Sequence, residues 1–193
     1  MHPDLEQIRR AFTGDSIEDA RRAPASRHAV VAAIVRQASV SAEVLLIERA
    51  DDERDPWSGH MGLPGGHREE TDDDLLATAR RETWEEIGLA LERDGTLLGR
   101  LDSARTATGD RGFEICPLVF ALERDTVLTL NPREVKRVVW ARLEYLLSPA
   151  AVATFEYARP GAPQLRFPAF NVEGRLVWGL TYRILDNLLD RLR

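Results

Sequence analysis

The chain has little cysteine, no excess of positive charge and no long apolar run, and each shortage excludes a class of protein. Its single cysteine, Cys116, cannot form an internal disulfide, so nothing indicates an oxidising compartment. The formal net charge of −6 leaves no basic field to hold a nucleic-acid backbone. Residues 1–10 lack the apolar core of a signal peptide, and no apolar run approaches membrane-spanning length. We therefore expect a cytoplasmic protein that binds neither nucleic acid nor membranes.

The length and composition are typical of one globular domain. The 193 residues are 44% hydrophobic and 30% charged, and they show no internal repeat, low-complexity tract or domain boundary. We expect one domain over residues 1–193, with an N-terminal helix and connector over about 1–27 and the core over 28–193. Because the net charge is negative, local arginines or bound cations must meet any polyanionic substrate.

Hydrophobic periodicity predicts strands interrupted by helices, and hence one α/β domain with a mixed sheet. Residues 14–27 and the proline-containing residues 148–168 are predicted to be irregular, and residues 51–71 form a long loop rich in glycine and proline. Helices are predicted near residues 5–12, 73–87 and 180–192, and strands over Ala29–Val35, Val44–Ile47, Thr96–Leu101, Phe113–Leu122 and Val135–Trp140.

The helix predicted over about residues 73–87 brings three carboxylates together. Asp72–Asp74 offer an N-cap, and Gly88 offers a C-terminal stop. At about 100° per residue, Glu82 and Glu86 border the core face of this helix, and Glu85 lies beside them. The residues predicted to form the core face itself are Leu76, Ala79, Thr83 and Ile87.

Carboxylates this close repel one another, and partial burial raises the cost. A hard divalent cation such as Mg²⁺ or Mn²⁺ removes the conflict, because it prefers oxygen ligands. Arg81 is one turn before Glu85 and can hold that carboxylate in place. The turn Pro64-Gly65-Gly66 allows close approach of backbone. Glutamates on a helix usually form only a solvent-exposed face. The choice between such a face and a metal site therefore depends on the complete sequence pattern around them.

That pattern, over residues 66–89, resembles the Nudix box Gly-x5-Glu-x7-Arg-Glu-U-x-Glu-Glu-x-Gly-U, where U is a bulky aliphatic residue. Arg81–Leu89 fit its second half, with Thr83 in place of the first U. Fourteen residues separate Gly66 from Arg81 where the pattern has thirteen, and we interpret the extra residue as a loop insertion. The acidic position of the first half falls on Asp72 or Asp73.

The resemblance implies an α/β fold. The expected architecture is the Nudix α/β/α sandwich with a mixed β-sheet, in which the box forms a loop–helix–loop. It also implies divalent-metal-dependent hydrolysis of a diphosphate bond in a nucleotide substrate. Carried over to this chain, Glu82, Glu85, Glu86 and the backbone of Gly66 would hold Mg²⁺ or Mn²⁺, and Arg81 would brace the glutamates. The bound ions would neutralise the diphosphate and lower the pKa of a water. A homodimer is also compatible with the resemblance.

The general base is left open between four carboxylates. Glu85 or Glu86 can serve, but many members of the family use a glutamate outside the box. The candidates there are Glu114, on a predicted strand, and Glu134, which follows Asn131-Pro132. For each of these two, an ordinary surface carboxylate is the alternative interpretation.

The residues upstream of the box are similar to a signature of coenzyme A diphosphatases. That signature is Leu-Leu-x-x-Arg-Ser/Ala-x3-Arg, a short spacer, Gly and then Pro-Gly-Gly, and residues 45–66 follow it with a spacer one residue too long and with Leu63 in place of Phe. Val177–Thr181 and the leucine-rich end are also similar to that subgroup. The resemblance implies that the substrate is coenzyme A or a derivative, cleaved to 3′,5′-ADP and 4′-phosphopantetheine.

Three residues of this segment are candidate substrate contacts. Arg49 and Arg54 can meet phosphate charge outside the metal site. Trp57 can stack on an adenine or line the cleft, although an aromatic residue in a loop more often only packs. His60 and His67 are interpreted as polar loop residues, and Trp178 and the terminal leucines as core.

Three alternatives compete with this hypothesis. One is a Nudix hydrolase that acts on ADP-ribose, another nucleotide sugar or a nucleoside triphosphate, because the box does not specify what lies beyond the diphosphate. Another is a non-catalytic nucleotide-binding module, although such modules typically lose glutamates that are present here. Isopentenyl diphosphate isomerase needs a cysteine ahead of the box, whereas Cys116 lies after it.

Overall fold

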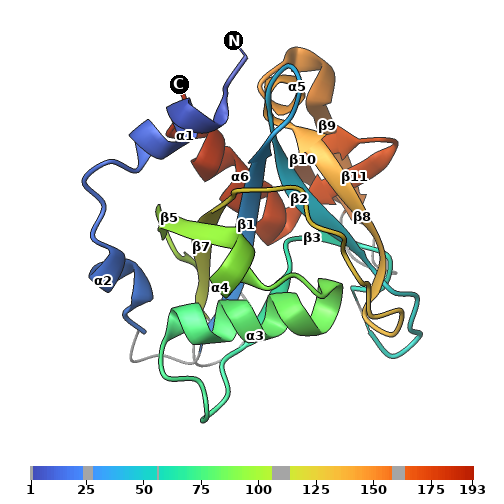
Figure 1. Ribbon diagram of the computed structural model, residues 1–193. Coiled ribbons are helices and arrows are strands. Elements are labelled where there is room, and N and C mark those ends of the chain that lie inside the picture. Colours follow the sequence, from blue (N-terminus) through green and yellow to red (C-terminus); the bar gives the residue numbers. More distant parts are fainter. Residues whose placement is uncertain (1, 24–27, 56, 106–113, 158–163) are drawn as a thin grey trace.

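The computed structural model describes residues 2–23, 28–55, 57–105, 114–157 and 164–193, and a mixed β-sheet lies at its centre (Figure 1). Strand β1 (His28–Gln37) runs parallel to β7 (Glu114–Leu122) and antiparallel to β2 (Ala42–Arg49), with Val35 opposite Val44 in the β1–β2 hairpin. The mixed sheet predicted from the sequence is therefore confirmed. Its other strands are β3 (Met61–Gly62) and β8 (Val135–Arg142) on β2, β4 (Gly65–His67) on β1, and β5 (Gly95–Arg100) and β6 (Ala104–Arg105) on β7.

Helices cover both faces of this sheet, which gives the expected α/β/α arrangement (Figure 1). The alternation along β1 divides its side chains, because neighbouring residues of a strand point to opposite faces. Val30, Ala32 and Ile34 pack on the side of α3 (Leu75–Ile87), and Ala33 and Val35 pack on the side of α6 (Gly179–Asp190). Each fully buried aliphatic side chain contributes roughly 1.5–3 kcal/mol. The apolar layer on one face therefore holds α3 against the sheet, and the layer on the other face holds α6.

The N-terminal helix α1 (Leu5–Ala11) confirms the first predicted helix and packs beside the C-terminal one. Its start is held by a capping box between Asp4 and Gln7. Arg191, just after α6, donates a hydrogen bond to Asp15 at 2.8 Å. The connector predicted over residues 14–27 contains a short helix, α2 (Ile17–Arg21), which the prediction missed because five residues are too few to show a periodicity.

A second, three-stranded sheet is the main departure from the predicted elements. It consists of β9 (Val152–Tyr157), β10 (Leu165–Val172) and β11 (Arg175–Trp178), all antiparallel. The prediction of an irregular segment over residues 148–168 was therefore wrong. One of the prolines of this segment, Pro168, lies within β10, opposite Thr154. The short helices α4 (Leu91–Asp94), α5 (Leu143–Leu146) and η1 (Pro149–Ala151) complete the described part.

Within the described ranges, no helix is both long enough and apolar enough to cross a membrane.

Candidate active site

Helix α3 carries the candidate carboxylates, and its ends are held by local interactions. Asp74 is the N-cap and accepts a hydrogen bond from the N–H of Ala77 at 2.8 Å. Gly88 ends the helix in the left-handed conformation, with φ 65° and ψ 21°. The helix thus begins two residues later than predicted, and the predicted core face is buried: Leu76, Ala79, Thr83 and Ile87.

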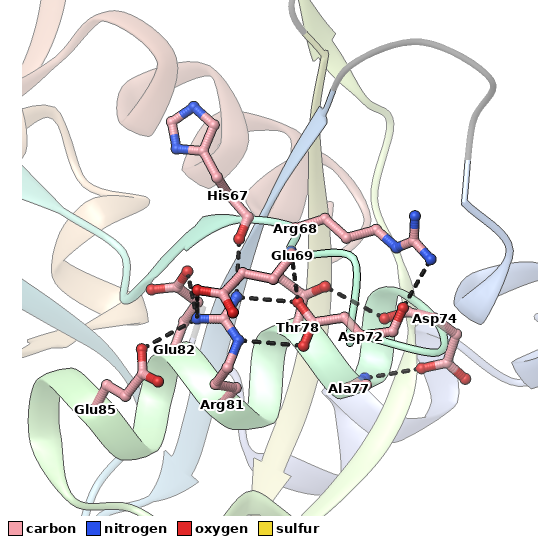
Figure 2. A network of polar contacts seen from close by, with 10 residues as sticks. All are labelled: His67, Arg68, Glu69, Asp72, Asp74, Ala77, Thr78, Arg81, Glu82 and Glu85. Carbon is pink, nitrogen blue, oxygen red and sulfur yellow. Dashed lines mark hydrogen bonds and ion pairs between the residues drawn. The ribbon is translucent and has the colours of Figure 1, made fainter.

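Arg81 lies at the centre of the polar network on α3 (Figure 2). Its guanidinium donates hydrogen bonds to Glu82 at 3.0 Å, to Glu85 at 3.1 Å and to the carbonyl of His67 at 2.8 Å. It also donates two to Asp72, and this interaction raises the pKa of Arg81 above its usual value. The predicted contact with Glu85 is therefore present, and Arg81 also ties the preceding loop to the helix.

The structure distinguishes between the two aspartates that could fill the acidic position of the loop. Asp72 is only 5% exposed and also accepts a hydrogen bond from the N–H of Glu69 at 2.9 Å. Burial raises the pKa of Asp72, but the hydrogen bonds from Arg81 and Glu69 outweigh it and leave the pKa below its usual value. Asp73 is exposed. The aspartate that contacts Arg81 is therefore Asp72.

Glu86 is the most deeply buried carboxyl of the group, at 3% exposure. Its Oε2 accepts a hydrogen bond from the N–H of Gly65 at 2.8 Å. Burial raises the pKa of Glu86 to about 8, and the charges of Glu82 and Glu134 act in the same direction. Burial also raises the pKa of Glu82. Two neighbouring carboxyls therefore resist ionisation, because burial disfavours their charged forms.

The two glycines of the turn allow the loop to lie against these carboxyls. Gly65 has φ +145°, and a Cβ there would lie 2.1 Å from the carbonyl oxygen of Val30. A Cβ on Gly66 would lie 2.6 Å from the carboxylate of Glu82. A side chain at Gly65 would clash with the backbone of β1, whereas one at Gly66 would meet only the carboxylate end of Glu82, because the loop passes between β1 and the glutamates.

Of the two candidate bases outside the box, the structure brings only Glu134 near the α3 carboxyls. The charge of Glu134 raises the pKa of both Glu82 and Glu86. Its segment is tied to the end of α3, since Asn131 donates its backbone N–H to the carbonyl of Glu86 at 2.9 Å. Glu114 instead forms an ion pair with Arg100 at 3.5 Å.

The three candidate substrate contacts lie in different surroundings. Arg49 forms an ion pair with Asp55 at 2.7 Å, and its charge lowers the pKa of Glu86. Arg54 is exposed and pairs with Asp52 at 3.0 Å within its own loop. Trp57 is 55% exposed and lies near Trp178, with 6.2 Å between ring centroids.

The assignment of Trp178 to the core was wrong, because its side chain is only partly buried. Its indole lies among other rings at the end of β11. Of the terminal leucines assigned to the core, Leu185 and Leu188 are buried, whereas Leu180 and Leu192 are partly buried and pack against it. The buried members of α6 are Ile184, Leu185, Leu188 and Leu189.

The donor groups fit a hard divalent cation, but their present arrangement does not form a closed coordination sphere. Glu82, Glu85 and Glu86 supply carboxylate oxygens, which Mg²⁺ and Mn²⁺ prefer. Arg81 contacts two of the three, and in the described part of the chain no three acidic, histidine or cysteine side chains converge on one point. Binding of an ion therefore requires rotation of the exposed Glu85 or of Glu82.

Comparisons with known proteins agree with this geometry. The chain is 36% identical over 132 residues to an uncharacterised Schizosaccharomyces pombe protein, covering 66% of this chain and 40% of that protein. It is 28% identical over 149 residues to the Nudix hydrolase NudL of Photorhabdus laumondii, covering 77% of each. A Caenorhabditis elegans Ap4A hydrolase has a similar fold, with a TM-score of 0.52 and 20% identity over 63% of this chain and 83% of that one. The family model of the NUDIX domain matches residues 26–159, so the chain belongs to the Nudix family of pyrophosphohydrolases.

Proposed function

We propose that the protein hydrolyses the diphosphate bond of coenzyme A or a derivative, releasing 3′,5′-ADP and 4′-phosphopantetheine. The hydrolase assignment depends mainly on one observation, the pair of carboxyl groups of Glu82 and Glu86. Burial raises the pKa values of both, and Glu86 accepts a hydrogen bond from Gly65 in the adjacent turn. Carboxyls whose pKa values are shifted by burial and by neighbouring charges are candidates for a functional site. The sequence similarity upstream of the box supports coenzyme A as the substrate.

Nudix hydrolases generally use divalent metal ions, and Glu82, Glu85 and Glu86 would hold Mg²⁺ or Mn²⁺ here, with the backbone of Gly66 as a further ligand. When bound, the ions would stabilise negative charge on the diphosphate and make a water more acidic. Arg81 orients the glutamates, because it contacts both Glu82 and Glu85 as well as the loop.

Glu134 is the proposed general base. It lies close enough to Glu82 and Glu86 to raise their pKa values, and it is exposed, so it can accept a proton from water at the surface. The water oxygen forms a bond to phosphorus, the bridging P–O bond breaks, and the water proton passes to the carboxylate. Glu85 and Glu86 are the alternatives for this role.

Arg49, Arg54 and Trp57 are proposed to contact the substrate beyond its diphosphate. The charge of Arg49 acts on Glu86, and this arginine would exchange Asp55 for a phosphate. Arg54 is exposed in the same loop and would reach a second phosphate, such as the 3′-phosphate of coenzyme A, after leaving Asp52.

The test is a substrate panel with Mg²⁺ or Mn²⁺: coenzyme A, ADP-ribose, a dinucleoside polyphosphate and deoxynucleoside triphosphates, with products identified by mass spectrometry. We expect 3′,5′-ADP and 4′-phosphopantetheine to form faster than any other product. Faster cleavage of another compound would overturn coenzyme A and retain the hydrolase, whereas no metal-dependent turnover would overturn the hydrolase itself. Glu86→Gln, which should fold and be inactive, is the control for contaminating activity.

The cytoplasmic location and the homodimer stay predictions. Sedimentation of the purified protein tests the dimer.

A further inference from the structure

Six aromatic side chains form a partly exposed cluster at one end of the second sheet. We define the aromatic cluster as Trp57, His60, Phe155, Tyr157, Phe167 and Trp178, none of which is buried. Trp178 is central. Its ring centroid lies 3.8 Å from that of Phe155, in a stacked arrangement, and 5.4 Å from that of His60. The other three rings lie 5.7 to 6.4 Å from it: Phe167, Trp57 and Tyr157.

The register of the second sheet explains why these rings share one face. Phe155 and Phe167 are directly paired on β9 and β10, and Tyr157 lies two residues beyond Phe155 on the same face. Trp178 pairs with Ala169, a residue too small to cover the sheet there. The indole can therefore lie flat over Phe155. These rings are adjacent and only partly covered, and contiguous apolar surface that meets water is a feature of interaction sites.

The aromatic cluster continues directly from the candidate active site. Arg49 donates its backbone N–H to the carbonyl of His60 at 3.0 Å, and its guanidinium charge is felt by both His60 and Glu86. The Arg49–Asp55 ion pair is therefore joined through the backbone to the loop of the rings, and the charge of Arg49 acts on the buried carboxyl of α3. A substrate with its diphosphate at the carboxyls and its next phosphate at Arg49 would extend toward the aromatic cluster.

The chemistry of the aromatic cluster suits a planar, uncharged ring. Burial lowers the pKa of His60, so its imidazole is neutral at pH 7 and adds to the aromatic surface. Trp57 lies in the loop and is 55% exposed, so its indole can close on a ligand without disturbing the sheet. Phe167 and Trp178 lie outside residues 26–159, the range that matches the family model. Phe155 and Tyr157 lie within that range, so the C-terminal strands add to a surface that begins in the shared domain.

We propose that the aromatic cluster binds the nucleobase of the substrate by stacking, with Trp57 as the ring that closes over it and Trp178 and Phe155 as the opposing wall. The inference rests on the proposed function, because it takes the substrate to be a nucleotide. It extends that function by assigning base recognition to the C-terminal strands.

The test uses AMP as the probe without metal, so that nothing can be turned over, and ribose 5-phosphate as the matched probe without a base. Affinity is measured by calorimetry, and stacking by quenching of tryptophan fluorescence. We expect AMP to quench the fluorescence and to bind at least about tenfold more tightly than ribose 5-phosphate, since stacking on an aromatic side chain has effects of about this size or larger.

Trp57→Ala should weaken AMP binding by about tenfold or more and leave ribose 5-phosphate unaffected. Trp84→Ala is the matched control, because Trp84 is 58% exposed and lies on α3. Tyr157→Ser is a second variant, which leaves the loop of Trp57 intact. It should weaken AMP binding less than Trp57→Ala does. Unchanged AMP affinity in both Trp57→Ala and Tyr157→Ser would overturn the proposal, as would a dimer that depends on Trp57 while AMP affinity stays the same.

The outcomes separate this inference from the proposed function. If the wild-type protein hydrolyses coenzyme A and Trp57→Ala does so with unchanged KM, the base site is wrong and the hydrolase is right. If nothing is hydrolysed but AMP binds through Trp57, the base site is right and the hydrolase is wrong. Glu86→Gln should bind AMP with wild-type affinity, which shows that base binding is independent of turnover.

Discussion

Arg81 Nε and Nη2 donate to Asp72 Oδ1 and Oδ2 at 3.1 and 3.0 Å, so the two side chains form a bidentate pair between α3 and the loop that precedes it. Such a pair fixes the orientation of the guanidinium as well as its position. Because the same guanidinium contacts Glu82 and Glu85, Asp72 helps to orient these two carboxylates, which we propose to be part of the catalytic site.

Asp72→Asn should therefore lower activity about tenfold or more, whereas Asp73→Asn, at an exposed position, should change it little. At pH 7, Asp72→Asn should also lower the free energy of unfolding by about 1–3 kcal/mol. The folded pKa of Asp72 is below its ordinary 3.8, so its contribution is complete above that value and disappears as the pH falls through the folded pKa. Urea unfolding between pH 2 and pH 7 measures this. A constant difference between wild type and Asp72→Asn would contradict the ionised pair.

The buried carboxyl of Glu86 should make the metal-free protein less stable as the pH rises. A folded pKa of about 8 against 4.5 for an ordinary glutamate means that the folded state holds the proton more tightly. Stability from this group is complete below about pH 4.5 and is lost progressively up to about pH 8. Glu86→Gln cannot ionise, so in EDTA at pH 8 or above it should be more stable than wild type by roughly 2–4 kcal/mol, since a tenfold change in proton affinity is about 1.4 kcal/mol.

Thermal unfolding of wild type and Glu86→Gln at pH 5 and pH 9 tests this. Glu92→Gln is the control, because Glu92 is exposed on α4. Added Mg²⁺ or Mn²⁺ should raise the midpoint of wild type at pH 9 and not that of Glu86→Gln. Equal effects of the ion on both proteins would mean that Glu86 is not a ligand.

Alanine at the two adjacent glycines should separate folding from activity. Gly65→Ala places a Cβ on the carbonyl of Val30 at a positive φ, so it should lower the free energy of unfolding by roughly 3 kcal/mol. Gly66→Ala meets only the end of the Glu82 side chain, which can rotate. It should cost less than about 1 kcal/mol of stability and reduce kcat on the order of 100-fold, because Glu82 is displaced. Denaturant unfolding and steady-state kinetics on both variants test this prediction. Equal stabilities of the two variants would contradict it and would show that the loop backbone can shift.

The buried carboxylate of Glu48 should be a main link between the two sheets. It lies on β2 and accepts hydrogen bonds from Arg137 on β8, at 2.6 Å, and from Arg175 on β11. Burial raises the pKa of Glu48, but these two arginines outweigh it and hold the pKa below its usual value. Glu48→Ala leaves the arginines without their shared partner and should lower the free energy of unfolding by about 3 kcal/mol. Glu53→Ala, at an exposed position, is the control, and a similar effect of both would refute the link.

The helix that carries the carboxylates was predictable because its determinants are local. Asp74 and Gly88 cap α3, and a period of 3.6 residues places Glu82 and Glu86 one turn apart. The strands of the central sheet were predictable for the same reason, since β1, β2, β7 and β8 are long and apolar. The second sheet was not predicted from the sequence. Residues of β9 alternate between exposed and partly buried positions, with none fully buried, and β10 contains Pro168.

The amino-acid sequence by itself determined the box, the helix and the type of ligand that the three glutamates provide, since all of these depend on neighbours within one or two turns. Only the tertiary structure decided that Asp72, and not Asp73, contacts Arg81, that Glu134 lies near Glu86, and that Trp57 meets Trp178. Most of these residues are far apart along the chain. Asp72 and Asp73 are adjacent and differ only in the direction of their side chains. Packing of the sheets and loops, and not the spacing along the chain, sets the distances between them.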